Sequence, residues 1–182
     1  LIDKGSIGMG VTCKTTAKLN YLQGTIYQQL EKNFDRKTSK LYLESQIEAI
    51  RLIKKIIEKE KINCDLEKCN SFIFTKEDKG IEKIKKEKEI LESFGINCKE
   101  VSALPIHFPI KYGLVASDTY TFHPLKYIEG LKKIVQKKID ICENRIALEI
   151  TKKQDEWETK TNLGTITSKY VVVACHYPFF LF

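Results

Sequence analysis

Residues 5–18 gather glycines, hydroxyl side chains and lysines in one short stretch: Gly5-Ser-Ile-Gly-Met-Gly-Val-Thr-Cys-Lys-Thr-Thr-Ala-Lys18. Backbone N–H groups that glycines leave accessible, together with hydroxyl groups and ammonium groups, are donors that can bind a diphosphate. The same composition is typical of a flexible loop in which Thr15 or Thr16 caps a following helix. The glycine spacing differs from Gly-x-Gly-x-x-Gly, so both interpretations stay open.

An acidic residue stands just before this stretch. Asp3 follows Leu1-Ile2, which we expect to be the end of a β-strand. In a dinucleotide-binding fold, an acid at the end of the second strand accepts hydrogen bonds from the ribose hydroxyls of adenosine, about 20 residues after a Gly-rich loop. That loop would lie before Leu1, and Asp3 is alternatively an ordinary turn residue.

Histidines and cysteines give weaker indications of chemistry. His107 and His123 are the histidines that could face a pocket, but a histidine directly before Pro124 also suits a structural role. The cysteines form no Cys-x-x-Cys pair, which predicts free thiols and no metal site; they are Cys13, Cys64, Cys69, Cys98, Cys142 and Cys175. No catalytic side chain can be assigned.

The charge of the chain, +7 with 31 basic residues, raises the question of nucleic acid. The arginines that bidentate phosphate recognition favours are confined to Arg36, Arg51 and Arg145. The lysines alternate with glutamates, as in 81–92, which is typical of a solvated helix face, so we expect no nucleic-acid partner. The sequence has neither an apolar run of about 20 residues nor a signal peptide, so we expect a cytoplasmic protein without membrane contact.

Hydrophobic periodicity predicts helices near 20–34, 39–60, 77–94 and 124–137. Thr38-Ser39 can cap the second of these helices. Thr75 stands three residues before Asp78 in an arrangement similar to a capping box, and Gly95 ends the third helix. Pro124 suits the first turn of the fourth.

The remaining segments predict strands. Residues 71–75 form one, brief strands fill 98–123, and hairpin strands occupy 146–150, 156–159 and 165–169 with a turn at 162–164. Tyr170–Ala174 is a wholly apolar strand. We expect an α+β (α/β) fold in which strands near 72, 98–122 and 140–160 make one antiparallel or mixed sheet, covered by the helices at 39–60, 77–94 and 124–137.

Several blocks of the chain resemble, in the same order, the D-amino-acid oxidase superfamily of FAD-dependent oxidoreductases. Residues 1–18 resemble the end of the second strand and the flavin loop, 122–128 the return into a helix, 143–147 the strand that passes the adenine, and 157–178 the closing hairpin and strand. That strand usually ends Ala-Thr-Gly, whereas Cys175 and His176 stand here. A subgroup that joins this flavoprotein to a Rieske iron-sulfur domain has a similar ending, although no Rieske cysteine-histidine pattern occurs here.

The resemblance also implies a domain organisation. Residues 1–20 and 164–182 would be parts of an incomplete FAD-binding, Rossmann-like domain, and 21–163 would be the substrate-binding domain. The chain would then be an internal fragment of a longer flavoenzyme. Because the Gly-rich loop would be missing, we expect the fragment by itself to be inactive and without bound FAD.

By the same resemblance, Asp3 would hold the ribose hydroxyls and Lys4 would lie near the adenosine. Lys18 would approach the flavin ring, and Ala147 would contact adenine through its backbone. His123 is the candidate substrate-binding residue, and no residue is expected to bind a metal. The other cofactor contacts would be Gly10, Thr12, Thr15, Thr16 and Ala17 at the diphosphate, and Ala174 and Cys175 at the far end of the chain.

The function that this resemblance implies is oxidation of an amine or amino acid by hydride transfer to flavin, with a small molecule as the partner. The alternative is a basic α+β binding module that recognises nucleic acid or an acidic protein. The oxidoreductase interpretation requires a Gly-x-Gly-x-x-Gly about 20 residues before Asp3 in the intact protein. The binding module requires a clustered basic face.

Overall fold

The computed structural model describes residues 1–174, which divide into two compact units. The helix–sheet unit comprises 15–131, and the hairpin unit comprises 1–14 together with the chain from 132 onward. Both contain antiparallel sheets, and helices accompany them, which confirms the α+β class. The sequence had grouped 132–163 with the preceding residues, whereas the structure groups them with the first fourteen. Which unit binds a cofactor or a substrate stays a prediction.

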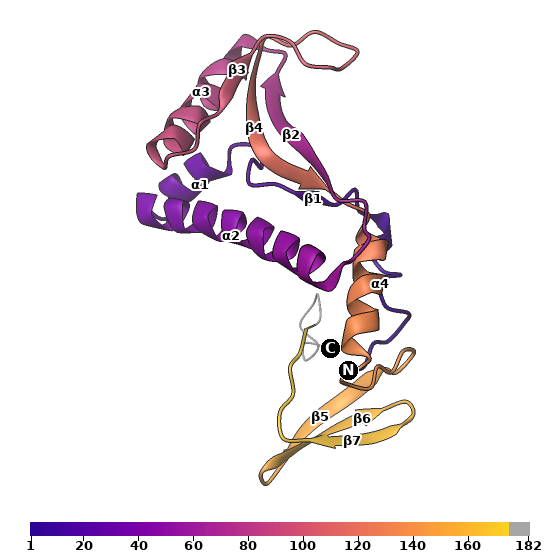
Figure 1. The fold of residues 1–182 in the computed structure, drawn as a ribbon. Helices are drawn as coiled ribbons and strands as arrows, with labels where there is room; N and C mark the ends of the chain where they lie inside the picture. Colours follow the sequence, from indigo (N-terminus) through magenta and orange to yellow (C-terminus); the bar gives the residue numbers. More distant parts are fainter. Residues whose placement is uncertain (175–182) are drawn as a thin grey trace. The chain divides into compact units, whose positions relative to one another are not determined.

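The helix–sheet unit is built around one long strand, β4 (Tyr112–Thr121). β2 (Glu67–Thr75) pairs antiparallel along one edge of β4, and β1 (Lys18–Leu19) and β3 (Lys99–Val101) follow one another along the other edge. The three helices of this unit, α1 (Ile26–Asn33), α2 (Arg36–Glu60) and α3 (Asp78–Ser93), lie on one side of the sheet (Figure 1). α4 (Pro124–Val135) follows β4, and the chain passes from one unit to the other within it.

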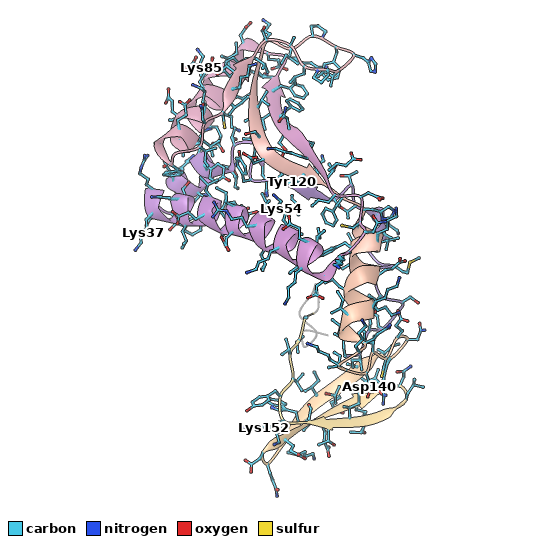
Figure 2. All side chains as sticks on the ribbon, in the orientation of Figure 1. Lys37, Lys54, Lys85, Tyr120, Asp140 and Lys152 are labelled. Carbon is cyan, nitrogen blue, oxygen red and sulfur yellow. The ribbon has the colours of Figure 1, made fainter. Side chains whose placement is uncertain are left out.

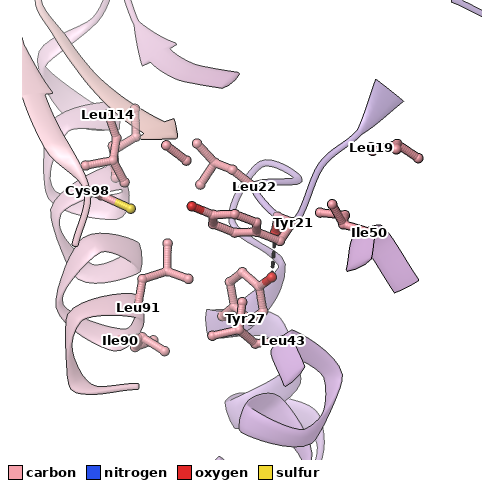
Figure 3. Packing of buried hydrophobic residues seen from close by; sticks show 12 residues of the cluster. Leu19, Tyr21, Leu22, Tyr27, Leu43, Ile50, Ile90, Leu91, Cys98 and Leu114 are labelled. Carbon is pink, nitrogen blue, oxygen red and sulfur yellow. Dashed lines mark hydrogen bonds between the residues drawn. The ribbon is translucent and has the colours of Figure 1, made fainter. Parts of the chain in front are cut away.

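The core of this unit lies between the helices and one face of the sheet. Leu114 of β4, Leu91 of α3 and Leu43 of α2 are almost completely buried there, and α1 contributes Tyr27 (Figure 3). The Tyr27 hydroxyl donates to the backbone oxygen of Tyr21 at 2.5 Å, so the polar end of this large side chain is satisfied inside the core. Burial raises the pKa of Tyr21 to about 12, so its phenol stays protonated at neutral pH.

α2 begins earlier than its sequence predicted. Asp35 is the N-cap, and its carboxylate accepts from the Thr38 N–H at 2.6 Å, so the capping role expected of Thr38-Ser39 is wrong. An ionised carboxylate interacts with the positive end of the helix dipole more strongly than a hydroxyl does. Ser39 is instead buried and donates to the backbone oxygen of Tyr27 at 3.2 Å.

The ends of α3 agree only in part with the prediction. Gly95 ends the helix as expected: its φ is 86°, and its N–H donates to the Glu92 oxygen at 2.9 Å. Thr75 does not cap the helix across three residues, because its hydroxyl accepts from the Glu77 N–H at 3.0 Å within a local turn. Glu77 is the N-cap and makes no side-chain capping bond.

The hairpin unit has its own three-stranded antiparallel sheet, made of β5 (Ala147–Lys153), β6 (Glu156–Thr161) and β7 (Gly164–Ser168). The predicted turn at 162–164 joins β6 to β7. The expectation that strands near 140–160 extend the sheet of β2 and β4 is wrong, since the two sheets share no strand pairing. Hydrophobic alternation predicts strands but does not identify their partners.

The strand predicted for Tyr170–Ala174 is not formed in the described residues. These side chains are largely exposed, with Tyr170 at 85% and Val172 at 88%. A strand requires hydrogen bonds to a neighbouring strand, and no segment of residues 1–174 pairs with this one. The residues are apolar as expected, but the pairing that would make them a strand is absent from the described residues.

Glu87 of α3 is a completely buried carboxylate that holds the first turn of α1. It accepts from the backbone N–H groups of Tyr27 at 2.9 Å and Gln28 at 3.1 Å, and from the Gln28 side-chain amide at 2.9 Å. These N–H groups belong to the set that every helix leaves without an internal partner. Burial raises the pKa of Glu87, while the three hydrogen bonds partly oppose that shift.

We expect Glu87→Ala to lower the free energy of unfolding by about 2–4 kcal/mol, because two backbone donors lose their acceptor in a buried site. Chemical denaturation followed by circular dichroism measures this. Glu89→Ala, an exposed glutamate two residues along the same helix, is the matched control and should change stability by less than about 0.5 kcal/mol. Equal effects of the two substitutions would contradict a capping role for Glu87.

Candidate functional site

Asp3 is fixed by backbone pairing in the hairpin unit. Its N–H donates to the Cys142 oxygen at 3.0 Å, and its own oxygen accepts from the Arg145 N–H at 2.8 Å. Ile2 forms an isolated parallel bridge with Cys142, so the strand end predicted at Leu1-Ile2 is a single bridge in the structure. One carboxylate oxygen of Asp3 accepts from the Gly5 N–H at 2.8 Å, and the other accepts no hydrogen bond within residues 1–174. The side chain is therefore oriented and retains acceptor capacity.

The residues after Asp3 form a chain of tight turns. The Met9 N–H donates to the Ser6 oxygen at 3.1 Å, and a 3₁₀ turn follows at Thr12–Lys14. Gly10 is exposed, and a side chain added there would meet nothing within 4 Å. Lys4 is exposed and Thr12 half-buried. Residues 4–14 are therefore a series of turns, and diphosphate binding by this stretch stays a prediction.

Glu143 lies in the segment that pairs with Asp3, and it holds the turns that follow Asp3. One of its carboxylate oxygens accepts from the Ile7 N–H at 2.8 Å, and the other lies 2.8 Å from the Lys132 ammonium group. The ion pair with Lys132 and the Ile7 hydrogen bond hold the pKa of Glu143 below its usual range. The Asn144 N–H also donates to the Gly5 oxygen at 3.2 Å. Sequence reasoning did not single out Glu143 or Lys132, because nothing in the spacing of the sequence connects them to Ile7.

Polar side chains also fix the segment that leads into β5. The Asn162 side chain accepts from the Ile146 N–H at 2.8 Å and donates to the Asn144 oxygen at 3.3 Å. The Arg145 guanidinium donates to the Thr161 hydroxyl at 3.1 Å. Ala147, a predicted adenine contact, begins β5 opposite Thr161 and is half-buried. Ala174 is exposed, and Cys175 lies outside the described residues.

The other predicted cofactor residues belong to the helix–sheet unit. No helix begins at Thr15 or Thr16, so the capping interpretation of these residues is wrong; the Thr15 hydroxyl accepts from the Ala17 N–H at 3.2 Å. Ala17 is buried with φ of 35°, a region that side chains disfavour, and the chain enters β1 there. Lys18 is exposed and pairs with Thr121 of β4.

His123 lies two residues beyond that pairing, directly before α4. Its backbone N–H donates to the Cys64 oxygen at 2.7 Å, and its ring Nδ1 accepts from the Lys126 N–H at 3.4 Å. The ring therefore caps the first turn of α4 while remaining exposed. This contact gives His123 a structural role, and its substrate-binding role stays a prediction.

The face of the β2–β4 sheet opposite the core carries large apolar side chains that sequence reasoning missed. Phe72 and Phe74 alternate with the core-facing residues of β2 and are 40% and 41% exposed. Phe108 lies over the same face, with its ring 5.7 Å from that of Phe74, and the Lys76 ammonium group lies 3.7 Å from the Phe108 ring centre. The period-two pattern of β2 could have indicated this second face.

Residues 1–174 contain neither a membrane-spanning helix nor a metal-binding cluster. No helix there has both the length and the apolar character needed to cross a membrane. In the same range, no three histidine, cysteine, aspartate or glutamate side chains stand where they could share a metal ion. The cysteines at 13, 64, 69, 98 and 142 are free thiols.

Comparison with known proteins identifies the family of the chain. A family model described as FAD dependent oxidoreductase matches residues 1–179. The chain belongs to the family of FAD-dependent oxidoreductases. This confirms the resemblance in the ordered blocks of its sequence.

A curated protein of Bacillus subtilis (strain 168), named "Putative Rieske 2Fe-2S iron-sulfur protein YhfW", is 30% identical to this flavoprotein chain over 181 residues. The match covers 99% of the chain and 36% of that protein, so the chain spans about a third of the length of this relative. The name agrees with the subgroup that the ending of the chain suggested.

Solved structures of low sequence identity share the fold. Glycine oxidase from Geobacillus kaustophilus matches with a TM-score of 0.75 at 13% identity, over 95% of this chain and 47% of that one. The dithionite-reduced L-alpha-glycerophosphate oxidase from Mycoplasma pneumoniae, with FAD bound, matches with a TM-score of 0.65 at 15% identity, over 88% of this chain and 42% of that one. These flavoenzymes act on different substrates, so the fold by itself does not select one.

We expect Asp3→Ala to release the Gly5 amide, which should exchange with deuterium about 5- to 10-fold faster, because one hydrogen bond contributes about 1 kcal/mol. Asp3→Asn retains a side-chain oxygen acceptor and is the matched control. The Cys142 amide, which donates to the Leu1 oxygen, should keep its protection in both variants. Unchanged exchange at Gly5 in Asp3→Ala would show that the carboxylate does not order this turn.

Proposed function

We propose that the intact protein containing this chain binds FAD and oxidises a small amine or amino acid. The observation that carries the cofactor part is the fixed carboxylate of Asp3, next to the Ile2–Cys142 bridge and followed directly by a region of turns. Family membership supports the same cofactor. The name of glycine oxidase, the structure with the 0.75 TM-score, supports an amino-acid substrate.

The residues of the hairpin unit fit the adenosine and diphosphate parts of FAD. The oxygen of Asp3 that makes no bond within residues 1–174 can accept from ribose hydroxyls, which is the role of the acid at this strand end in dinucleotide folds. The open space around Gly10 permits close approach of a diphosphate to the backbone. Thr12 adds a hydroxyl, and Lys4 adds a positive charge near the strand end.

Bound FAD would supply the ring that accepts a hydride from a substrate C–H bond next to an amine nitrogen. The protein's own contribution is to bind, orient and exclude water. Lys18 is an exposed cation at the β1–β4 pairing, and a positive charge beside the flavin ring would stabilise the negative charge that the ring gains on reduction. No residue among 1–174 is assigned as a general base, since oxidation of a neutral amine by hydride loss does not require one.

The exposed aromatic side chains of β2, Phe72 and Phe74, together with Phe108 are the surface that we assign to the substrate. Its aromatic rings can exclude water from a reacting C–H bond, and apolar contacts there would favour a substrate with an apolar side chain. The cation beside Phe108, Lys76, can attract a substrate carboxylate. This assignment favours an apolar amino acid over glycine.

A basic binding module is the competing function. Figure 2 shows labelled lysines on different elements, with Lys37 on α2 and Lys85 on α3. Many lysines are already paired with acids: Lys85 lies 3.3 Å from Glu82, and Lys68 lies 2.6 Å from Asp118. Lys54 of α2 instead donates to the Tyr120 hydroxyl at 2.8 Å. Dispersed and paired lysines disfavour a nucleic-acid face, because such a face needs clustered, available charge.

The cofactor proposal predicts that the intact protein purifies with visible flavin absorption. The 182-residue chain by itself is titrated with FAD for comparison. The measurement is the visible absorption spectrum of both proteins with and without added FAD. An intact protein that stays colourless after FAD is added would contradict the proposal, and salt-dependent binding to DNA or RNA would then favour the binding module.

The substrate proposal predicts that apolar amino acids reduce the flavin of the intact protein faster than glycine does, under anaerobic conditions. Phe74→Ala should lower kcat/KM for the preferred apolar substrate about 10-fold, because one large apolar contact contributes about 1–3 kcal/mol. Phe34→Ala, an aromatic residue 68% exposed at the end of α1, is the control and should change nothing. Faster reduction by glycerol phosphate than by any amine or amino acid would overturn the amine assignment while retaining the flavoenzyme.

A further inference from the structure

The Lys132–Glu143 ion pair connects the last turn of α4 to the turns that follow Asp3. We propose that this pair holds residues 5–9 so that the chain reaches Gly10 in the conformation that binds the FAD diphosphate. Glu143 and Lys132 are thus positioning residues for the cofactor and need not contact it. The inference rests on the proposed function, because it assigns the loop a cofactor to hold.

Backbone pairing between the first residues of the chain and residues 142–145 stops at Gly5. Backbone hydrogen bonds join these two segments from the Asp3–Cys142 bond to the Gly5–Asn144 bond. Beyond Gly5 the next attachment to that segment is the Ile7 N–H, at 2.8 Å from the Glu143 carboxylate. Glu143 therefore extends the pairing by one more contact, through a side chain instead of the backbone.

The Glu143 contact fixes the position of the Ile7 N–H. Ile7 lies between Ser6 and Met9, whose own hydrogen bond of 3.1 Å closes the first turn. Gly8, with φ of 82°, stands inside that turn. With Ile7 held from one side and the turn closed from the other, the chain that leads to Gly10 has a defined path. A preorganised loop binds a ligand more tightly, since less conformational freedom is lost on binding.

Lys132 acts on the turn through the carboxylate of Glu143. Glu143 uses both oxygens, one for Ile7 and one for Lys132 at 2.8 Å, so the ammonium group fixes the rotation of the carboxylate. Both side chains are partly shielded, at 32% exposure for Lys132 and 29% for Glu143. Partial burial makes the pair less sensitive to salt than a surface pair. Removing Lys132 leaves the carboxylate able to reach Ile7 but with more freedom.

A purely structural ion pair makes a different prediction. Its loss would lower the melting temperature without altering affinity for the cofactor. A positioning pair changes cofactor affinity by more than a global loss of stability explains. Graded variants also separate the two, because Glu143→Gln retains an oxygen for the Ile7 N–H but turns an amide NH2 toward Lys132 and so loses that contact.

The test measures the FAD dissociation constant of the intact protein after its flavin is removed and titrated back, followed by flavin fluorescence. Glu143→Ala should raise this constant about 10-fold, which is about 1.4 kcal/mol. Glu143→Gln and Lys132→Met should each raise it about 3-fold, the partial rescue that a positioning role requires. Glu156→Ala and Lys133→Met, exposed residues of the same unit and the same helix, are the matched controls and should leave it unchanged.

Hydrogen exchange on the protein without FAD gives a second readout. The Ile7 amide should exchange faster in Glu143→Ala, and less so in Glu143→Gln. An unchanged FAD dissociation constant in Glu143→Ala, with wild-type binding intact, would overturn this inference and leave the proposed function standing. Failure of the wild-type protein to bind FAD would overturn the proposed function instead, and the inference with it.

Discussion

The candidate site depends on the pairing of the first residues of the chain with residues 142–145. Hydrogen bonds in both directions hold Asp3 between Cys142 and Arg145, although well over a hundred residues separate the partners in sequence. The entropic cost of bringing such distant segments together grows only slowly with their separation, so a small number of hydrogen bonds can contribute to offsetting it. Without this pairing Asp3 would have no fixed direction, and Glu143 could not reach Ile7.

The helix–sheet unit solves a different problem, which is to cover one face of a sheet and leave the other available. Helices α1 to α3 bury Leu114 and Ala116, and the buried Glu87 satisfies the start of α1 so that this short helix can pack in the core. On the opposite face Phe72 and Phe74 are exposed at levels unusual for phenylalanine. These exposed aromatic side chains are the surface that the proposed function assigns to the substrate.

Local features were predicted well where a residue type has one strong conformational preference. Gly95 ends α3 because glycine adopts a positive φ at little cost, and Asn162-Leu-Gly164 makes the predicted hairpin turn for the same reason. Prediction failed where partners are interchangeable. Either Asp35 or Thr38-Ser39 could cap α2, and the carboxylate took that role; an apolar pattern such as Tyr170–Ala174 requires a partner strand that sequence alone cannot supply.

The sequence by itself determined the family, the type of most elements and the acid and glycine-rich stretch near the start, because these follow from residue identities at short range. Tertiary structure alone decided that 132–163 group with the first fourteen residues, and that β5–β7 form a separate sheet. It also decided that Glu143 and Lys132 hold the turn at Ile7, and that His123 caps α4. The physical reason is the same in each case: a hydrogen bond or ion pair between distant residues depends on their positions in space, and one sequence carries no local signal of those positions.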